Sequence, residues 1–175
     1  VLSARGLDTM LRDMEKQQIL MGEVMDQADQ DKAVKKYGQL EDRFSSLGGY
    51  EAESEAARIT NSLGLEDRIL GQPLSTLSGG QRRRIELARI LFSDAEVLIL
   101  DEPTNHLDAD SMIWLREFLK NYSGGFIVIS HDVELVGETV NKVFYLDANR
   151  QQIDVYNMGW KNYLRQREAD EERRK

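Results

Sequence analysis

The chain has 175 residues, no cysteine and a formal net charge of −8. The absence of cysteine excludes disulfides and thiolate metal sites, and the negative charge argues against a general nucleic-acid-binding surface. No apolar run approaches the roughly 20 residues that span a bilayer, so we expect no stable membrane insertion. Arg5 and Asp8 interrupt any signal-peptide core, and we predict a cytoplasmic location. The chain starts at Val1 without an initiator methionine, which suggests a fragment.

Two seams of apolar residues predict a helical hairpin at the start of the chain. Each seam repeats at alternating steps of about 4 and 3, as on one helix face. The first comprises Leu7, Leu11, Met14, Gln18, Met21 and Met25, and the second Ala33, Tyr37, Leu40, Phe44 and Leu47. The polar stretch between them predicts an antiparallel coiled-coil hairpin over residues 5–47. A third helix fits Ala52 to Leu63, with Gly64 as its left-handed stop, and we expect residues 1–74 to form a helical subdomain.

The composition changes after Pro73, where a β-α-β unit is predicted. Val97–Leu100 and Phe126–Ile129 are short, continuously apolar runs, as expected for parallel strands covered on both faces. A crossover helix around Leu115 fits between them. Lys142–Leu146 and Gln152–Tyr156 predict two more strands joined by a turn at residues 148–150. We therefore predict an α/β core over residues 75–158 and the start of a charged linker helix over 159–175.

Ser78-Gly79-Gly80-Gln81 opens a predicted helix over Arg82–Phe92 and is the first candidate site. The plain alternative is a capping box, because Ser-x-x-Gln caps a helix without further function. Two glycines weaken a first turn, but they leave backbone N–H groups bare at the positive end of a helix. Such a terminus accepts a phosphate, and the Ser78 hydroxyl would add one donor. We favour the anion-binding interpretation.

A second candidate site follows the two predicted parallel strands. Asp101 and Glu102 emerge at the carboxyl edge of the first strand, where parallel sheets bind ligands. Asp101 suits Mg²⁺ through a water, and Glu102 would orient or deprotonate an attacking water. The alternative is an acidic pair that caps the next turn. His131 ends the next strand, where a lone histidine often has a structural role. In this order of motifs we favour a contact between His131, the terminal phosphate of a nucleotide and the catalytic water. His106 stays ambiguous.

These motifs, in this order, closely resemble the ATP-binding cassette (ABC) superfamily over residues 73–147. Leu77–Gln81 matches its signature motif, Leu98–Glu102 its Walker B strand with the catalytic glutamate, Asn105–Asp108 its D-loop and His131 its switch histidine. Within the superfamily, the run Asp-Glu-Pro-Thr-Asn-His-Leu-Asp from residue 101 is similar to the ABC-F subfamily, soluble proteins with two cassettes on one chain that act on ribosomes. The helical hairpin resembles the arm of that subfamily.

The resemblance implies a fold and a set of site residues. The fold would be a partial P-loop NTPase (RecA-like) nucleotide-binding domain, with ATP and Mg²⁺ as cofactors. Catalysis would rest on Glu102 and His131, metal binding on Asp101, and nucleotide contacts on Ser78, Gly79, Gly80, Gln81 and Asp108. The sequence contains no Gly-x-x-x-x-Gly-Lys-[Ser/Thr] loop (Walker A), no Q-loop and no adenine-stacking aromatic. We therefore expect the back portion of a first cassette, inactive alone.

The resemblance also implies partners for the parent protein. The signature of one cassette covers ATP held by the other, so the first partner would be a second cassette of the same chain. Arm and linker would touch ribosomal RNA and tRNA, so that ATP binding and hydrolysis act on the ribosome in translation. Two alternatives stay open: the nucleotide-binding subunit of a membrane transporter, and a non-catalytic interaction fragment.

Overall fold

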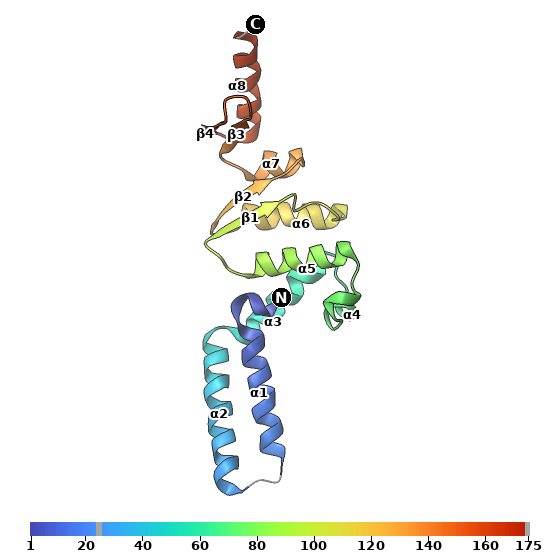
Figure 1. Ribbon diagram of the computed structural model, residues 1–175, viewed down its shortest axis with the longest axis vertical. Helices are drawn as coiled ribbons and strands as arrows, with labels where there is room; N and C mark the ends of the chain where they lie inside the picture. Colours follow the sequence, from blue (N-terminus) through green and yellow to red (C-terminus); the bar gives the residue numbers. More distant parts are fainter. Residues whose placement is uncertain (24–25, 174–175) are drawn as a thin grey trace. The chain divides into compact units, whose positions relative to one another are not determined.

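A computed structural model describes residues 1–23 and 26–173 of the chain (Figure 1). The chain divides into two compact units. Unit 1 comprises Val1–Glu96 and His106–Ser111, and unit 2 comprises Val97–Asn105 and Met112–Lys175. Met25 of the predicted first seam and the last two residues of the predicted linker lie outside the described residues. No described helix combines the length and the apolar character that crossing a bilayer requires.

Helices build the main part of unit 1. Two short 3₁₀ helices accompany five α-helices, in the order η1 (Leu2–Arg5), α1 (Leu7–Gly22), α2 (Gln27–Ser46), α3 (Gly49–Ser62), α4 (Asp67–Leu70), η2 (Leu74–Thr76) and α5 (Gly79–Phe92). Helices α1 and α2 pack side by side as a hairpin, and α3 packs against both α2 and α5 (Figure 1). The predicted third helix is α3, and Gly64 follows it with a φ of 69°, the left-handed stop that the sequence indicated.

The structure corrects two positions of the predicted hairpin seams. Gln17, not Gln18, is buried in α1. Leu7 and Met14 are buried one heptad apart, and the second core position of a heptad lies three residues after the first, which is Gln17. Leu47 is exposed because it is the C-cap of α2 and no longer belongs to the helix face.

Unit 2 holds two separate two-stranded sheets. The elements from residue 97 onward are β1 (Val97–Asp101), α6 (Ala109–Lys120), β2 (Gly125–Ile129), α7 (Val133–Thr139), β3 (Val143–Asp147), β4 (Gln152–Tyr156) and α8 (Trp160–Arg173). Strands β1 and β2 are parallel, with Val97 opposite Gly125 and Asp101 opposite Ile129. Strands β3 and β4 form an antiparallel hairpin, so all four predicted strands are observed. The parallel register sets the carboxyl ends of β1 and β2 side by side.

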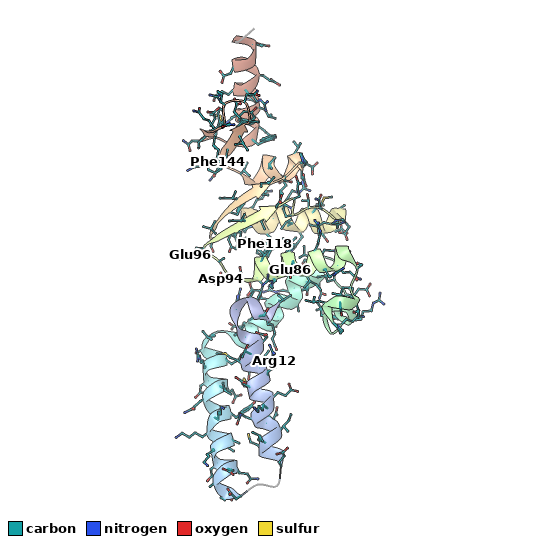
Figure 2. All side chains as sticks on the ribbon, in the orientation of Figure 1. Arg12, Glu86, Asp94, Glu96, Phe118 and Phe144 are labelled. Carbon is teal, nitrogen blue, oxygen red and sulfur yellow. The ribbon has the colours of Figure 1, made fainter. Side chains whose placement is uncertain are left out.

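The expectation that both faces of the parallel sheet are covered is wrong for the described residues. Leu98 and Leu100 are buried, but Ile99 is 72% exposed and Ile129 is 60% exposed. Side chains alternate between the faces of a strand, so one face is buried and the other is open. The β3–β4 hairpin also carries exposed apolar side chains, among them Phe144 at 56% (Figure 2). An apolar run predicted strands correctly, but it could not tell whether a second layer covers them.

The predicted domain boundaries at residues 74 and 158 stay predictions. Unit 1 extends to Glu96, because α5 packs against α3 and η1 and so groups with the preceding helices. The helix predicted from residue 159 is α8, which begins at Trp160. Within unit 2, α8 packs against α7.

Candidate functional site

The signature segment, Leu77–Gln81, begins helix α5 with a complete capping box. The Ser78 side chain accepts a hydrogen bond from the Gln81 amide at 3.2 Å, and Gln81 Oε1 accepts one from the Ser78 amide at 2.9 Å. The capping box that the sequence offered as an alternative is therefore present. The capping box satisfies the backbone N–H of the third helical residue. It does not use the backbone N–H groups of Gly79 and Gly80, which, as in the first turn of any helix, have no partner inside the helix.

The two glycines leave these amides accessible. Gly79 is exposed, and a methyl group added there would meet no described atom within 4 Å. The Ser78 hydroxyl accepts a bond through its oxygen, so its proton can still be donated. Bare amides and a hydroxyl at the positive end of a fourteen-residue helix suit an anion. Capping and anion binding are compatible, because they use different donors.

The D-loop segment, Asn105–Asp108, contributes its last residues to unit 1. Asp108 Oδ1 accepts a hydrogen bond from the Ser111 amide at 2.8 Å and so caps the first turn of α6. The backbone N–H of Ser111, then its hydroxyl, and finally the charge of Arg84 hold the pKa of Asp108 below its usual value. His106 has a φ of 68°, and its Cβ would lie 3.8 Å from a methyl group on Gly80. The D-loop therefore lies beside the signature segment within unit 1.

Sequence reasoning missed the role of Arg84 in this arrangement. Its Nη1 donates to the carbonyl oxygens of Leu63 at 3.3 Å and Gly64 at 3.2 Å, where α3 ends. A methyl group on Gly64 would lie 3.0 Å from that nitrogen and 3.3 Å from Asp108 Oδ2. Arg84 thus ties α5 to the end of α3. The signal in the sequence was weak, since three consecutive arginines follow Gln81 and nothing local distinguishes the third.

The second group of candidate residues lies at the carboxyl ends of β1 and β2 in unit 2. The Glu102 amide donates to the Ile129 carbonyl at 2.8 Å, and Glu102 Oε2 accepts from the His131 amide at 3.2 Å. His131 Nε2 lies 3.4 Å from Glu102 Oε1. The Glu102 side chain is 22% exposed, whereas that of His131 is 100% exposed. Sequence reasoning predicted both residues, and the structure brings them together.

Asp101 is the last residue of β1 and is exposed beside this pair. Among residues 1–23 and 26–173, no cluster of three or more histidine and acidic side chains could hold a metal ion by itself. A lone carboxylate fits Mg²⁺, which keeps several of its waters and takes further oxygens from a bound phosphate. Unit 2 therefore holds Asp101, Glu102 and His131, and unit 1 holds Ser78, Gly79, Gly80, Gln81 and Asp108.

Comparisons with known proteins identify a family for the chain. The family described as ABC transporter matches residues 7–105. The uncharacterized ABC transporter ATP-binding protein YkpA of Bacillus subtilis is 41% identical over 119 residues, 68% of this chain and 22% of that protein. ABC transporter F family member 4 of Arabidopsis thaliana is 38% identical over 125 residues, 71% of this chain and 17% of that protein. The chain thus spans about a fifth of the length of these relatives.

A solved structure gives the same fold. It contains an archaeal ribosome recycling factor in complex with an archaeal ribosomal stalk protein. The match covers 64% of this chain and 23% of the matched chain, at 22% sequence identity and a TM-score of 0.50. At that identity the likeness shows the fold alone; the family match gives this fold as that of a nucleotide-binding domain of ATP-binding cassettes. Because the family match covers more than half of its residues, the chain belongs to the ABC transporter family, and it resembles the F type of that family.

Proposed function

We propose that this chain is the signature-bearing and Walker B-bearing part of the first cassette of an ABC-F ATPase. The observation that carries the proposal is the contact between Glu102 and His131 at the carboxyl ends of two adjacent parallel strands. A carboxylate at that edge can orient or deprotonate water, and a neighbouring imidazole can contact the phosphate that the water attacks. The longer protein would therefore hydrolyse ATP.

Each candidate residue has a defined task in this proposal. Bound ATP and Mg²⁺ supply the reactive phosphate and a charge that polarises it. Glu102 would accept the proton of the attacking water, and Asp101 would hold the metal. His131 donates to the terminal phosphate from its exposed ring. The Gly79 and Gly80 amides and the Ser78 hydroxyl would bind phosphate oxygens of a nucleotide held by the second cassette. Gln81 and Asp108 would supply the remaining contacts to that nucleotide.

The proposed biological role follows the F type. The run from Asp101 to Asp108 resembles that subfamily, and a relative named as an F family member shares 38% identity with this chain. We infer that the longer protein is cytoplasmic and couples cassette closure to an action on the ribosome, with hairpin and linker as contacts to rRNA and tRNA. Association of the longer protein with membrane-spanning partners, and not with ribosomes, would favour a transporter subunit instead.

The decisive experiment is Glu102→Gln in the longer protein that contains this chain. Removing the charge should slow ATP hydrolysis by roughly 10²- to 10⁴-fold and leave ATP binding intact. Glu96→Gln is the matched control, because Glu96 is an exposed glutamate just before the amino end of β1. Turnover by the Glu102→Gln variant within about twofold of the parent would remove Glu102 from the mechanism.

A further inference from the structure

Arg5 makes three hydrogen bonds and one ring contact at the base of the α1–α2 hairpin. Its Nε donates to the Phe92 carbonyl at 2.7 Å, and its two terminal nitrogens bond both oxygens of Glu55 at 2.9 and 3.0 Å. The guanidinium carbon lies 4.0 Å from the centroid of the Phe92 ring. One side chain therefore joins η1 to the middle of α3 and to the last residue of α5.

The physical chemistry of these contacts fixes the guanidinium in one position. Phe92 ends α5, so its carbonyl has no partner inside the helix and lies at the negative end of the helix dipole. A cation is favoured at that end of the helix. The planar guanidinium can stack on an aromatic ring while it forms a bidentate pair with a carboxylate. The Arg5 side chain is only 24% exposed, and Phe92 is buried. Lysine could satisfy one of these contacts at a time.

A second joint connects the other helix of the hairpin to α3. Phe44, near the end of α2, is fully buried, and its ring contacts Tyr50 edge-on with centroids 5.1 Å apart. Gly49, the first residue of α3, lies so close to the Phe44 ring that a methyl group would be 2.5 Å from it. Helix α3 in turn packs against α5. Both ends of the hairpin are thus attached to the pair of helices that carries the signature segment.

We propose that Arg5 is a positioning residue for the signature helix: it makes the α1–α2 hairpin and α5 one rigid lever. Helix α5 has fourteen residues and is about 20 Å long, with Arg5 bound at one end and Gly79 and Gly80 at the other. A displacement of the hairpin therefore moves the phosphate-binding amides, and closure on nucleotide moves the hairpin. The joint itself is a property of this chain; its use in transmitting nucleotide state rests on the proposed function.

The test measures the lever in the 175-residue chain. The chain has no cysteine, so Ala28→Cys on α2 and Arg83→Cys on α5, both exposed, can carry a pair of spin labels. Pulsed electron paramagnetic resonance then gives the distribution of distances between hairpin and signature helix. Arg5→Ala should make that distribution about twofold broader, because the hairpin loses one of its two joints. Glu55→Gln, which keeps both Phe92 contacts, should broaden it less.

Arg12→Ala is the matched control. Arg12 is labelled in Figure 2; its side chain is 72% exposed and pairs with Asp8 at 2.6 Å within α1, so the distribution should not change. Circular dichroism checks that each variant keeps its helices. If Arg5→Ala loses them, Glu55→Gln takes its place: a broader distance distribution supports the proposal, and an unchanged one overturns it. Unchanged widths in folded Arg5→Ala, or equal broadening by Arg12→Ala, would overturn the proposal. ATP is absent from this measurement, so its outcome is independent of the ATPase test.

Discussion

Gly49 is the position at which the base of the hairpin has least room, and Gly49→Ala tests that packing. A methyl group there would lie 2.5 Å from two carbons of the Phe44 ring and 2.6 Å from a third. Because the ring is fully buried, it cannot turn into solvent. Overpacking costs about 1–3 kcal/mol, while alanine favours a helix over glycine by roughly 0.5–1 kcal/mol. We expect the free energy of unfolding of unit 1 to fall by about 1 kcal/mol, the middle of the difference between the two effects.

Urea unfolding provides the assay, and a double mutant cycle identifies the cause. Both tryptophans of the chain, Trp114 and Trp160, lie in unit 2, so their fluorescence reports on that unit and circular dichroism follows the helices of both. Phe44→Leu removes the ring, so Gly49→Ala should cost less in that background. If it costs the same with and without the ring, or costs nothing in either, Gly49 and the Phe44 ring are not closely packed in solution.

Three further predictions concern the nucleotide, the D-loop and the open sheet face. Titration calorimetry of this chain should show no saturable micromolar ATP binding, because amides at one helix end do not replace a phosphate loop with its lysine; such binding would contradict the division of labour proposed here. Asp108 has a pKa lowered chiefly by the Ser111 amide, so its carboxylate stabilises the fold above its unfolded pKa, and this contribution is lost as the pH falls through the folded pKa. Asp108→Asn should therefore make the free energy of unfolding depend less on pH at acidic pH. An unchanged dependence would show that the contact between Asp108 and the Ser111 amide is absent in solution. Ile99→Thr should reduce concentration-dependent association in sedimentation without lowering stability, because Ile99 is 72% exposed. At buried Leu98, the same change should destabilise unit 2 by about 2 kcal/mol or more, and equal effects at both positions would contradict the assigned faces.

Local chemistry made part of the fold predictable from the sequence. Gly64 follows α3 in the left-handed conformation, which glycine adopts at little cost, and the sequence indicated this stop. The open face of β1 was not predictable. A strand covered on both faces and a strand with one open apolar face can have the same apolar sequence. Only the layers packed around the strand distinguish the two. Ile99 is apolar in sequence and exposed in the structure for that reason.

The candidate site was predictable where topology alone decides proximity. Two side chains that follow adjacent parallel strands must lie near each other, and Glu102 and His131 do. The contacts of Arg5 and Arg84 were not predictable, because they join elements 87 and about 20 residues apart and depend on helix packing. The sequence around an arginine does not indicate which backbone carbonyl its guanidinium will bind. Long-range positioning contacts therefore need the structure, even when the residues they position do not.

The backbone at Glu102 shows how the fold holds the carboxylate at its place. Glu102 has a φ of 45°, a left-handed conformation that disfavours side chains by about 1–2 kcal/mol. Two contacts with the end of β2 offset this cost: the Glu102 amide bonds Ile129, and the carboxylate bonds the His131 amide. The geometry of Glu102 is therefore set by its neighbouring strand. The local conformation alone would favour glycine at that position, so the contacts with the neighbouring strand, and not the backbone preference, hold the carboxylate in place.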